Sequence, residues 1–368
     1  MSIRSLSLFV GVQLPVAVPV DVSDALERVE IDSAIGERGT FRLTFRVDRA
    51  TLPERFLRDS GDLLRVVLVL DEGRGTSVIM DGVMVVHTLT TGSEGEPSLT
   101  VIGEDLTLLM DLVDVGRSFP DMPVKARVQA LLAGYSAFGV VPLVILPPLP
   151  STPIPAERIP HQQGTDYAYI RLLADVVGFQ FTLDPGPAPA SSLAYWGPEP
   201  RADRSQPALS IDLGRRASVE TLQLSFDAHH RVLPEALVLD PVAKVPIPVP
   251  VPNIAALVPP LGAVIPPAHR QQRLRGTAKL TAAEAAGVLL AKAARSAEAM
   301  TGQGTMDVAR TRVRLRAGSI IEVLGAAKPF DGLFEVSRVR DTITPHHHSQ
   351  AFELVRAGIG AAAPGGRP

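Results

Sequence analysis

The strongest constraint on the fold is a run of β-strand patterns between Arg28 and Ile102. Five segments are rich in Val, Ile, Leu, Thr and Phe and alternate partly between apolar and polar residues. Gly, Asp or Ser stands at the joins, as is usual between short strands. Five such strands are the content of a small barrel or sandwich. The segments are RVEIDSAI, GTFRLTFRV, DLLRVVLVLD, TSVIMDGVMVVHTLT and PSLTVIG.

The pattern changes to helices and strands in the middle of the chain. In GTDYAYIRLLADVVGFQFTLDPG, apolar residues recur at helical spacing after Thr165, which is a suitable helix cap. Gly178 predicts the end of that helix, and FQFTL then reads as a strand that ends in the turn DPG. This α/β region separates two β regions.

The last β region resembles the first. GDLLRVVLVL at Gly61 and GSIIEVLG at Gly318 both place Gly and a polar residue before an apolar strand. Each is followed by a strand that we expect to begin at an Asp-Gly pair, at Asp81 and at Asp331, and then by PSLTVIG or SQAFELV. Such an echo predicts two copies of one β-barrel. Three chains of this kind would supply a ring of six near-equivalent barrels.

The segment from Val245 to Pro267 is uncharged and long enough to span a bilayer if it were helical. Its eight prolines exclude a helix, because proline lacks an N–H donor and clashes with the preceding turn. In hydrocarbon its carbonyls would be unsatisfied. We therefore expect an extended, polyproline-like loop that lies on protein, and no membrane insertion of the chain.

An Ala-rich stretch follows and predicts a helix over residues 281–300. Thr281 and Glu284 form a capping-box pattern at its start. Its small side chains suit close packing against a barrel or a neighbouring subunit. The final residues, 359–368, have no periodicity and predict a flexible tail.

The composition excludes several classes of protein. A formal net charge of −3 provides no basic field of the kind that neutralises phosphates, so we expect no nucleic-acid binding. The absence of cysteine excludes disulfides, thiolate zinc sites and a cysteine nucleophile. The apolar N-terminal run MSIRSLSLFVGVQLPVAVPV is interrupted by prolines and lacks a cleavage site, which favours a first strand over a signal peptide.

Motifs for catalysis are weak. TGQGTM lacks the glycines and the flanking elements of a dinucleotide turn. Ser136 stands in GxSxxG spacing at a predicted helix end, whereas a nucleophile elbow lies between a strand and a helix. Glu104 and Asp105 open a short predicted helix, where acidic residues complement the helix dipole. Asp81 and Asp331 before Gly indicate ordinary turns.

Histidines are the remaining candidates for a metal site. They are His161, the pair His229–His230 and the run His346–His348. Only His346 and His348 have the i, i+2 spacing that places two ligands on one face of a strand. No Asp or Glu lies at ligand spacing beside them, and they follow Thr344-Pro345, a turn signal. A solvated hairpin loop is the favoured interpretation, and a metal site at His346 and His348 is the alternative.

Three stretches resemble one family, the phage late control D and VgrG-like baseplate hub proteins of contractile tails and injection systems. The first is DGVMVVHTLTTGSEGEPSLTVIGEDLTLLM, a strand, loop and strand that lead into a short helix. The second is HQQGTDYAYIRLLADVVGFQFTLD, and the third runs from LRAGSIIEVLG to AFELVRAG. Their shared order carries the resemblance, which covers most of residues 28–358.

The resemblance implies an α+β, mainly β fold, with two related tube-type β-barrels around an α/β insertion. The implied domains are residues 1–115 for the first barrel, 116–205 for the insertion and 206–358 for the second barrel. The last includes a Pro-rich excursion, 233–267, which departs from the family pattern, and the helix 281–300. No OB-fold or β-helical needle follows, so the spike is expected to be a separate polypeptide.

The same resemblance implies a structural role with no enzymatic activity and no cofactor. Similar hubs are homotrimers whose six barrels form a pseudo-sixfold ring, which adapts a sixfold inner tube to a threefold spike. The implied partners are a separate spike protein, an inner tube protein and other baseplate components. The implied location is a tail-like particle assembled in the cytoplasm and extracellular after release.

Two other functions remain as alternatives. A peptidoglycan-degrading tail-associated enzyme is disfavoured because no stretch predicts a separate lysozyme-like helical domain with a Glu in a pocket. A β-sandwich carbohydrate-binding adhesin is disfavoured by an aromatic content of 5% and a single Trp196, since sugar platforms favour exposed aromatic rings.

Overall fold

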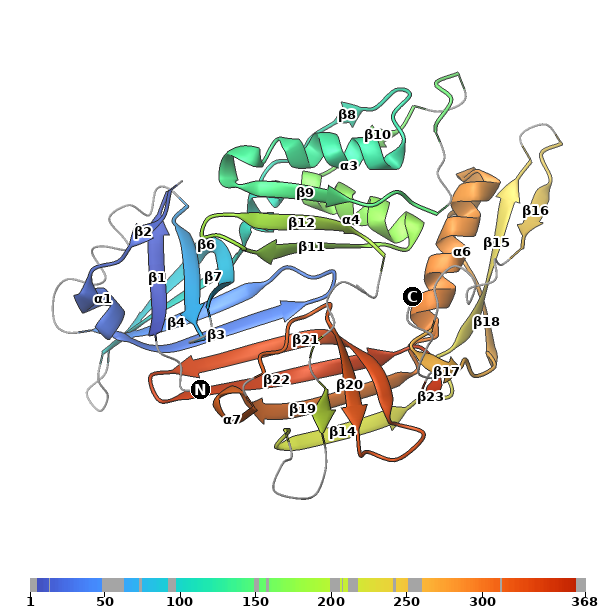
Figure 1. Cartoon of the computed structure of the whole chain (residues 1–368). Coiled ribbons are helices and arrows are strands. Elements are labelled where there is room, and N and C mark those ends of the chain that lie inside the picture. Colours follow the sequence, from blue (N-terminus) through green and yellow to red (C-terminus); the bar gives the residue numbers. More distant parts are fainter. Residues whose placement is uncertain are drawn as a thin grey trace.

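The computed structural model describes residues 5–12, 14–47, 63–72, 75–91, 97–148, 152–156, 159–198, 206, 208–210, 218–240, 243–250, 260–311 and 313–361. With 47% strand and 19% helix, the fold is mainly β, as predicted. Thirteen strands belong to one large sheet (Figure 1). No closed barrel is detected among the described residues, so the two predicted barrels stay a prediction.

The N-terminal half of this sheet has the strand order β3-β4-β7-β6-β5-β1-β2. Alternate residues point to one face, where Phe41, Leu43 and Phe45 of β4 are almost fully buried. The N-terminal run does form a strand, β1. Its elements are β1 (Ser5–Gly11), β2 (Val16–Ala17), α1 (Val20–Asp24), β3 (Leu26–Ala34), β4 (Thr40–Arg46), β5 (Arg65–Asp71), β6 (Thr76–Thr90) and β7 (Ser98–Asp105).

The C-terminal half of the sheet has the order β14-β19-β22-β21, and β20 pairs with β21. Its own core gathers Phe334, Val336 and Leu354, each 0% exposed. Residues 308–311 form a short helix, although DVARTRVRL reads as a strand. The elements are β13 (Leu209–Ser210), β14 (Thr221–Phe226), β19 (Met300–Asp307), α7 (Val308–Thr311), β20 (Ile320–Leu324), β21 (Gly332–Thr344) and β22 (His347–Arg356).

Between the halves lies a small α/β unit, the insertion. Its three-stranded sheet has the order β11-β12-β9, and its core contains Trp196 against Phe179 with ring centroids 4.9 Å apart. Thr165 accepts a hydrogen bond from Ala168 N at 3.1 Å and Gly178 ends α4 at φ 75°, both as predicted. The elements are η1 (Leu106–Asp111), β8 (Arg117–Ser118), α3 (Val124–Ala133), η2 (Ser136–Phe138), β9 (Val140–Val144), β10 (His161–Gln162), α4 (Asp166–Val177), β11 (Gln180–Pro185) and β12 (Ser192–Gly197).

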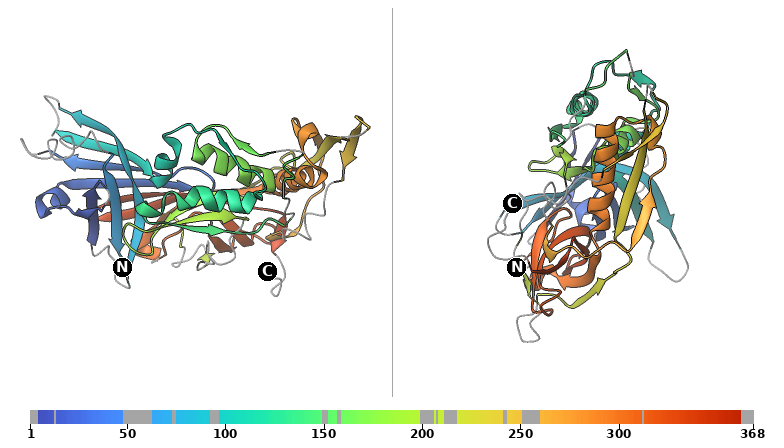
Figure 2. Two further views of the ribbon diagram at one scale, coloured as in Figure 1. Left: turned by 90° about the horizontal axis from the view of Figure 1, so that it is seen from above. Right: turned by 90° about the vertical axis from the view of Figure 1, so that its right-hand side faces the viewer.

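The Pro-rich excursion and the Ala-rich helix together form a projection that we call the arm. A small sheet, β16-β15-β18, packs one face on α6, and the arm extends from the right-hand end of the molecule in Figure 1 and in the left view of Figure 2. The elements of the arm are β15 (Val232–Leu239), β16 (Pro246–Val249), β18 (Arg270–Arg273), η3 (Thr277–Lys279) and α6 (Ala282–Ser296); the pair β17 (Gly262–Val264) and β23 (Ile359–Ala361) lies near its base.

Three expectations need correction in this region. The predicted loop 245–267 contains two strands, because Pro246–Val249 can use its carbonyls on an edge although proline lacks N–H donors. The helix keeps its capping box of Thr281 and Glu284 but ends at Ser296, since β19 begins at Met300. The first three residues of the predicted flexible tail, 359–361, form β23; the rest of the tail and residues 251–259 lie outside the described residues.

Among the described residues, no helix has both the length and the apolar character needed to cross a membrane.

Candidate assembly interface and buried polar clusters

The two halves of the sheet share one topology. The strand order is β3-β4-β7-β6-β5 in the first half and β14-β19-β22-β21-β20 in the second. When the strands of each half are counted along the chain, both orders read first, second, fifth, fourth, third. In both halves the fourth strand has a bulge against the fifth, between Met84 and Val86 and between Val336 and Arg338. The predicted internal repeat is therefore present in the order of the strands.

A pairing between β21 and β3 joins the two repeats, and we call this pairing the seam. It is antiparallel and runs from Arg338 opposite Ala34 to Ile343 opposite Val29. Across it, Asp32 accepts hydrogen bonds from Arg338 at 3.0 Å and Arg340 at 2.6 Å. The seam thus joins the fourth strand of one repeat to the first strand of the other.

Each seam strand has an equivalent in the other repeat: β6 is the equivalent of β21, and β14 is the equivalent of β3. Both equivalents have a side on which no described strand pairs with them. In β21, residues 332–335 pair with β20 and residues 338–343 pair with β3. The equivalent strand β6 pairs with β5 only up to Val83. Its outer part, residues 84–90, pairs with β7 on one side and has no described strand on the other. The equivalent of β3 is β14, which pairs with β19 alone among the described strands.

The open part of β6 carries exposed apolar side chains. Val85, Val86 and Leu89 are 46%, 45% and 49% exposed. When the two bulges are aligned, His87 and Leu89 correspond to Val339 and Asp341 of β21, which the seam covers and which are 2% and 3% exposed. The greater exposure of the side chains on β6 is what we expect if its pairing partner belongs to another molecule.

The histidine run is divided by its hairpin. Pro345 and His346 form the turn, and His347 and His348 begin β22. The prediction of a solvated loop is therefore wrong for His348, which is 1% exposed and whose Nε2 lies 2.6 Å from Asp341 Oδ1. Strand alternation explains this, because the third histidine faces the core. His346 and His348 are not brought together as ligands.

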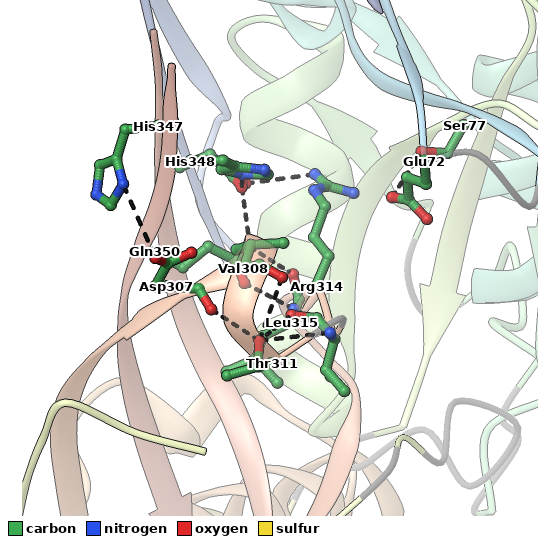
Figure 3. A network of polar contacts seen from close by, with 12 residues as sticks. Glu72, Ser77, Asp307, Val308, Thr311, Arg314, Leu315, His347, His348 and Gln350 are labelled. Atoms are coloured by element: carbon green, nitrogen blue, oxygen red, sulfur yellow. Dashed lines mark hydrogen bonds and ion pairs between the residues drawn. The ribbon is translucent and has the colours of Figure 1, made fainter. Parts of the chain in front are cut away.

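Figure 3 shows the polar cluster around His348. Arg314 lies 3.3 Å from Asp341 Oδ2, and Gln350 donates to Asp341 Oδ1 at 2.9 Å. Gln350 also accepts from Leu315 N at 2.8 Å and donates to Leu315 O at 3.0 Å. Burial alone would raise the pKa of Asp341, but the Arg314 charge and the His348 hydrogen bond outweigh it and hold that pKa below its ordinary value.

This cluster holds a connecting segment against the sheet. Its members come from the hairpin of β21 and β22 and from residues 313–316, a segment that precedes β20. No group of three or more His, Asp or Glu side chains that could hold a metal exists in the part of the chain that the structure describes. The sequence offered no signal for Arg314, because only tertiary packing brings it to Asp341.

Asp81 also differs from its prediction as a turn residue. It lies inside β6, and both its oxygens accept hydrogen bonds of 2.7 Å from Arg65. Ser192 of the insertion donates to the same carboxylate at 3.0 Å. The pair is almost fully buried and ties the first repeat to the insertion. Asp331, in contrast, is a turn residue as predicted and accepts from Ala326 N at 2.7 Å.

Glu104 and Asp105 lie at the start of η1, as predicted, and have different partners. Asp105 is the N-cap and accepts from Thr107 N at 2.9 Å and from Gly39 N at 2.5 Å. Burial raises the pKa of Asp105 to about 6, against the lowering effect of these donors. Glu104 instead pairs with Arg38 at 2.6 Å.

The other candidates lie apart. His161 contacts Ser118 at 3.0 Å, and the His229 backbone N–H donates to Asp227 at 2.8 Å. Ser136 opens the single turn η2 just after α3, so it is not on a strand-to-helix elbow. TGQGTM lies within β19 and forms no phosphate loop.

No family model matches the sequence, and no curated protein matches it. Solved structures match it in fold. The tail protein from Neisseria meningitidis MC58 has a TM-score of 0.63 at 15% identity, covering 96% of this chain and 97% of that chain. The 43 kDa tail protein of prophage MuSo2 from Shewanella oneidensis has a TM-score of 0.59 at 11% identity, covering 96% of each.

A third similar structure comes from a secretion system. The E. coli c3393 protein, described as a component of the type VI secretion system with structural similarity to the T4 bacteriophage tail proteins gp27 and gp5, has a TM-score of 0.54 at 14% identity. The match covers 93% of this chain and 77% of that chain. At these identities the similarity shows that the chain shares the fold of these proteins.

Proposed function

We propose that the chain is a structural baseplate hub of a contractile tail or injection system. Three copies form a homotrimer whose six repeats make a pseudo-sixfold ring between a sixfold inner tube and a threefold spike. The observation that carries this proposal is the seam and its open counterparts on β6 and β14. The fold shared with tail proteins and with a type VI secretion component supports it.

The ring follows from repeating the seam between molecules. Within the chain, β21 of the second repeat pairs with β3 of the first. The outer part of β6 and the free edge of β14 are the equivalent strands, so β14 of one copy can pair with β6 of the next. This contact joins different surfaces of the two copies, and such head-to-tail contacts form a ring when the rotation between copies closes after a whole number of chains. Three chains then place six equivalent repeats around one axis.

Each part of the chain has a role in this assembly. Residues 1–115 and 206–358 form the two tube-type barrels, completed across the seam contacts, and residues 116–205 form the insertion between them. The partners are a separate spike protein, an inner tube protein and other baseplate components. The role requires no enzymatic chemistry, and the particle is assembled in the cytoplasm.

The test is the mass of the purified protein in solution, measured by light scattering, together with negative-stain images. We expect a mass of three chains and threefold rings with a central pore, alone or after mixing with the tube and spike proteins. A protein that stays monomeric in the presence of both partners would refute the hub.

A further inference from the structure

The arm has a charge unlike the rest of the chain. The whole sequence holds 36 Lys and Arg against 39 Asp and Glu. Residues 232–296, which span the arm, contain seven Lys and Arg residues against three Asp and Glu residues. The described residues Lys244, Arg270, Arg273 and Arg275 are all exposed. The arm therefore presents a positive surface on a slightly acidic molecule.

The two edges of the arm sheet differ in what they can bind. The edge strand β16 contains Pro246 and Pro248, which lack N–H donors, so this edge cannot continue a regular ladder. The opposite edge strand is β18, which pairs in parallel with β15 and has no described strand on its other side. Among the described strands, one edge is thus blocked and the other is open.

The open edge of β18 offers backbone groups to a further strand. Leu274 N donates to Glu235 O of β15 at 2.8 Å. Because the N–H groups of successive strand residues point to opposite sides, Arg273 and Gln271 direct theirs away from β15. Gln271 and Arg273 are exposed, so these groups are accessible along with their side chains.

The sheet face beside this edge is partly apolar. Leu233 of β15 is 42% exposed, whereas Ala236 and Val238, which point the other way, pack on α6. Leu233 lies opposite Gln271 in the ladder. The nearest carboxylate to Arg273 belongs to Glu235, at 3.9 Å with both side chains well exposed, so solvent screens this pair.

We propose that β18 binds an extended acidic segment of a partner protein, which adds a fourth strand to the arm sheet. Charge complementarity identifies the acidic partner, and the open backbone edge requires a peptide chain. In the ladder Arg270 lies on one face of the sheet, whereas Arg273 and Leu233 lie on the other. A segment that alternates acidic and apolar residues would direct its acidic side chains to the face of Arg270 and its apolar side chains over Leu233. This binding does not depend on the proposed ring.

Nucleic acid is the competing ligand for a basic surface. Its phosphates need only the arginine charges, and its binding would weaken steeply with salt but would not use β18 N–H groups. The open backbone edge and the exposed Leu233 beside it favour the peptide.

The experiment uses the full-length protein and a fluorescein-labelled ten-residue peptide of alternating Val and Glu with capped ends. Fluorescence anisotropy measures its affinity at low and at high salt. We expect binding at low salt that the triple variant R270Q/R273Q/R275Q weakens by about tenfold or more, because charge-assisted contacts are lost. The matched control R42Q/R46Q/R117Q removes three exposed arginines elsewhere and should leave the affinity unchanged.

Two further measurements test whether the peptide binds as an added strand. A peptide of the same sequence in which every backbone amide is N-methylated has no N–H donor on either edge, and it should lose binding to the wild-type protein. The variant Gln271→Pro should also lose binding, since it removes an outward N–H and leaves the bond from Leu274 to β15. Unchanged binding by the N-methylated peptide, equal binding by a DNA duplex, or full affinity in the arginine triple variant would each overturn the proposal.

Discussion

At the scale of single residues, Asp105 links stability to pH. Its pKa is about 6 in the folded protein because it is buried, above the ordinary 3.8. The folded state therefore holds this proton more tightly than the unfolded chain, and the stability that Asp105 contributes is greatest below pH 3.8 and is lost as the pH rises through 6.

The variant Asp105→Asn cannot ionise and should lose this dependence. We expect the free energy of unfolding of the wild type, relative to that of Asp105→Asn, to fall by about 3 kcal/mol between pH 3.5 and pH 7. Urea denaturation at a series of pH values measures it. A constant difference between the two proteins would contradict the raised pKa.

The buried pair of Arg65 and Asp81 should be sensitive to the loss of one partner. Arg65→Met leaves the Asp81 carboxylate buried without its counter-charge, and we expect a loss of about 3–5 kcal/mol in the free energy of unfolding. Arg28→Met is the matched control, because Arg28 is half exposed in its pair with Glu30, and it should lose less than about 1 kcal/mol. Equal losses, measured by urea denaturation, would contradict a buried ion pair.

At the scale of elements, the contact between α4 and α6 depends on Gly178. Its φ is 75°, and an added Cβ would lie 2.8 Å from the Cβ of Ala291. Gly164 has a φ of 93° with open space around it. Gly164→Ala should therefore show backbone strain alone, about 1 kcal/mol, whereas Gly178→Ala adds a clash and should lose about 1–3 kcal/mol more. Thermal unfolding compares them, and equal melting temperatures would show that α6 shifts freely.

The elements that could be predicted from sequence are those whose signals are local. Thr165 and Gly178 bound α4 because a cap and a left-handed glycine act within one turn. The strands of the two repeats were likewise predictable, because apolar and polar residues alternate along them in the sequence. Asp81 was misread, because the Asp-Gly pair that signals a turn elsewhere lies inside β6, where only the distant Arg65 makes the carboxylate stable.

The histidines show the same limit at the candidate site. A turn at Pro345 was predictable from its residues, but the burial of His348 depends on Asp341, Gln350 and Arg314, which meet only in the folded sheet. The seam was not predictable either, because it pairs residues 29–34 with residues 338–343, which lie near opposite ends of the sequence.

At the scale of the whole molecule, the seam makes the two repeats one continuous sheet. A closed ring needs the same pairing between chains, and the outer part of β6 with its exposed Leu89 is the element available for it. The seam within a chain and the contact between chains can therefore be separated by mutation.

The variant Leu89→Glu places a charge where the neighbouring β14 would cover an apolar side chain, and burying an unpaired carboxylate is costly. We expect it to remain folded, with the circular dichroism and melting temperature of the wild-type monomer, while the trimer measured by light scattering dissociates at least about tenfold more readily. Leu172→Glu is the matched control, because Leu172 is 56% exposed on α4, away from both open edges. It should assemble as the wild type does. A trimer of Leu89→Glu as stable as that of Leu172→Glu would show that the ring closes through another surface, even if the chain is a hub.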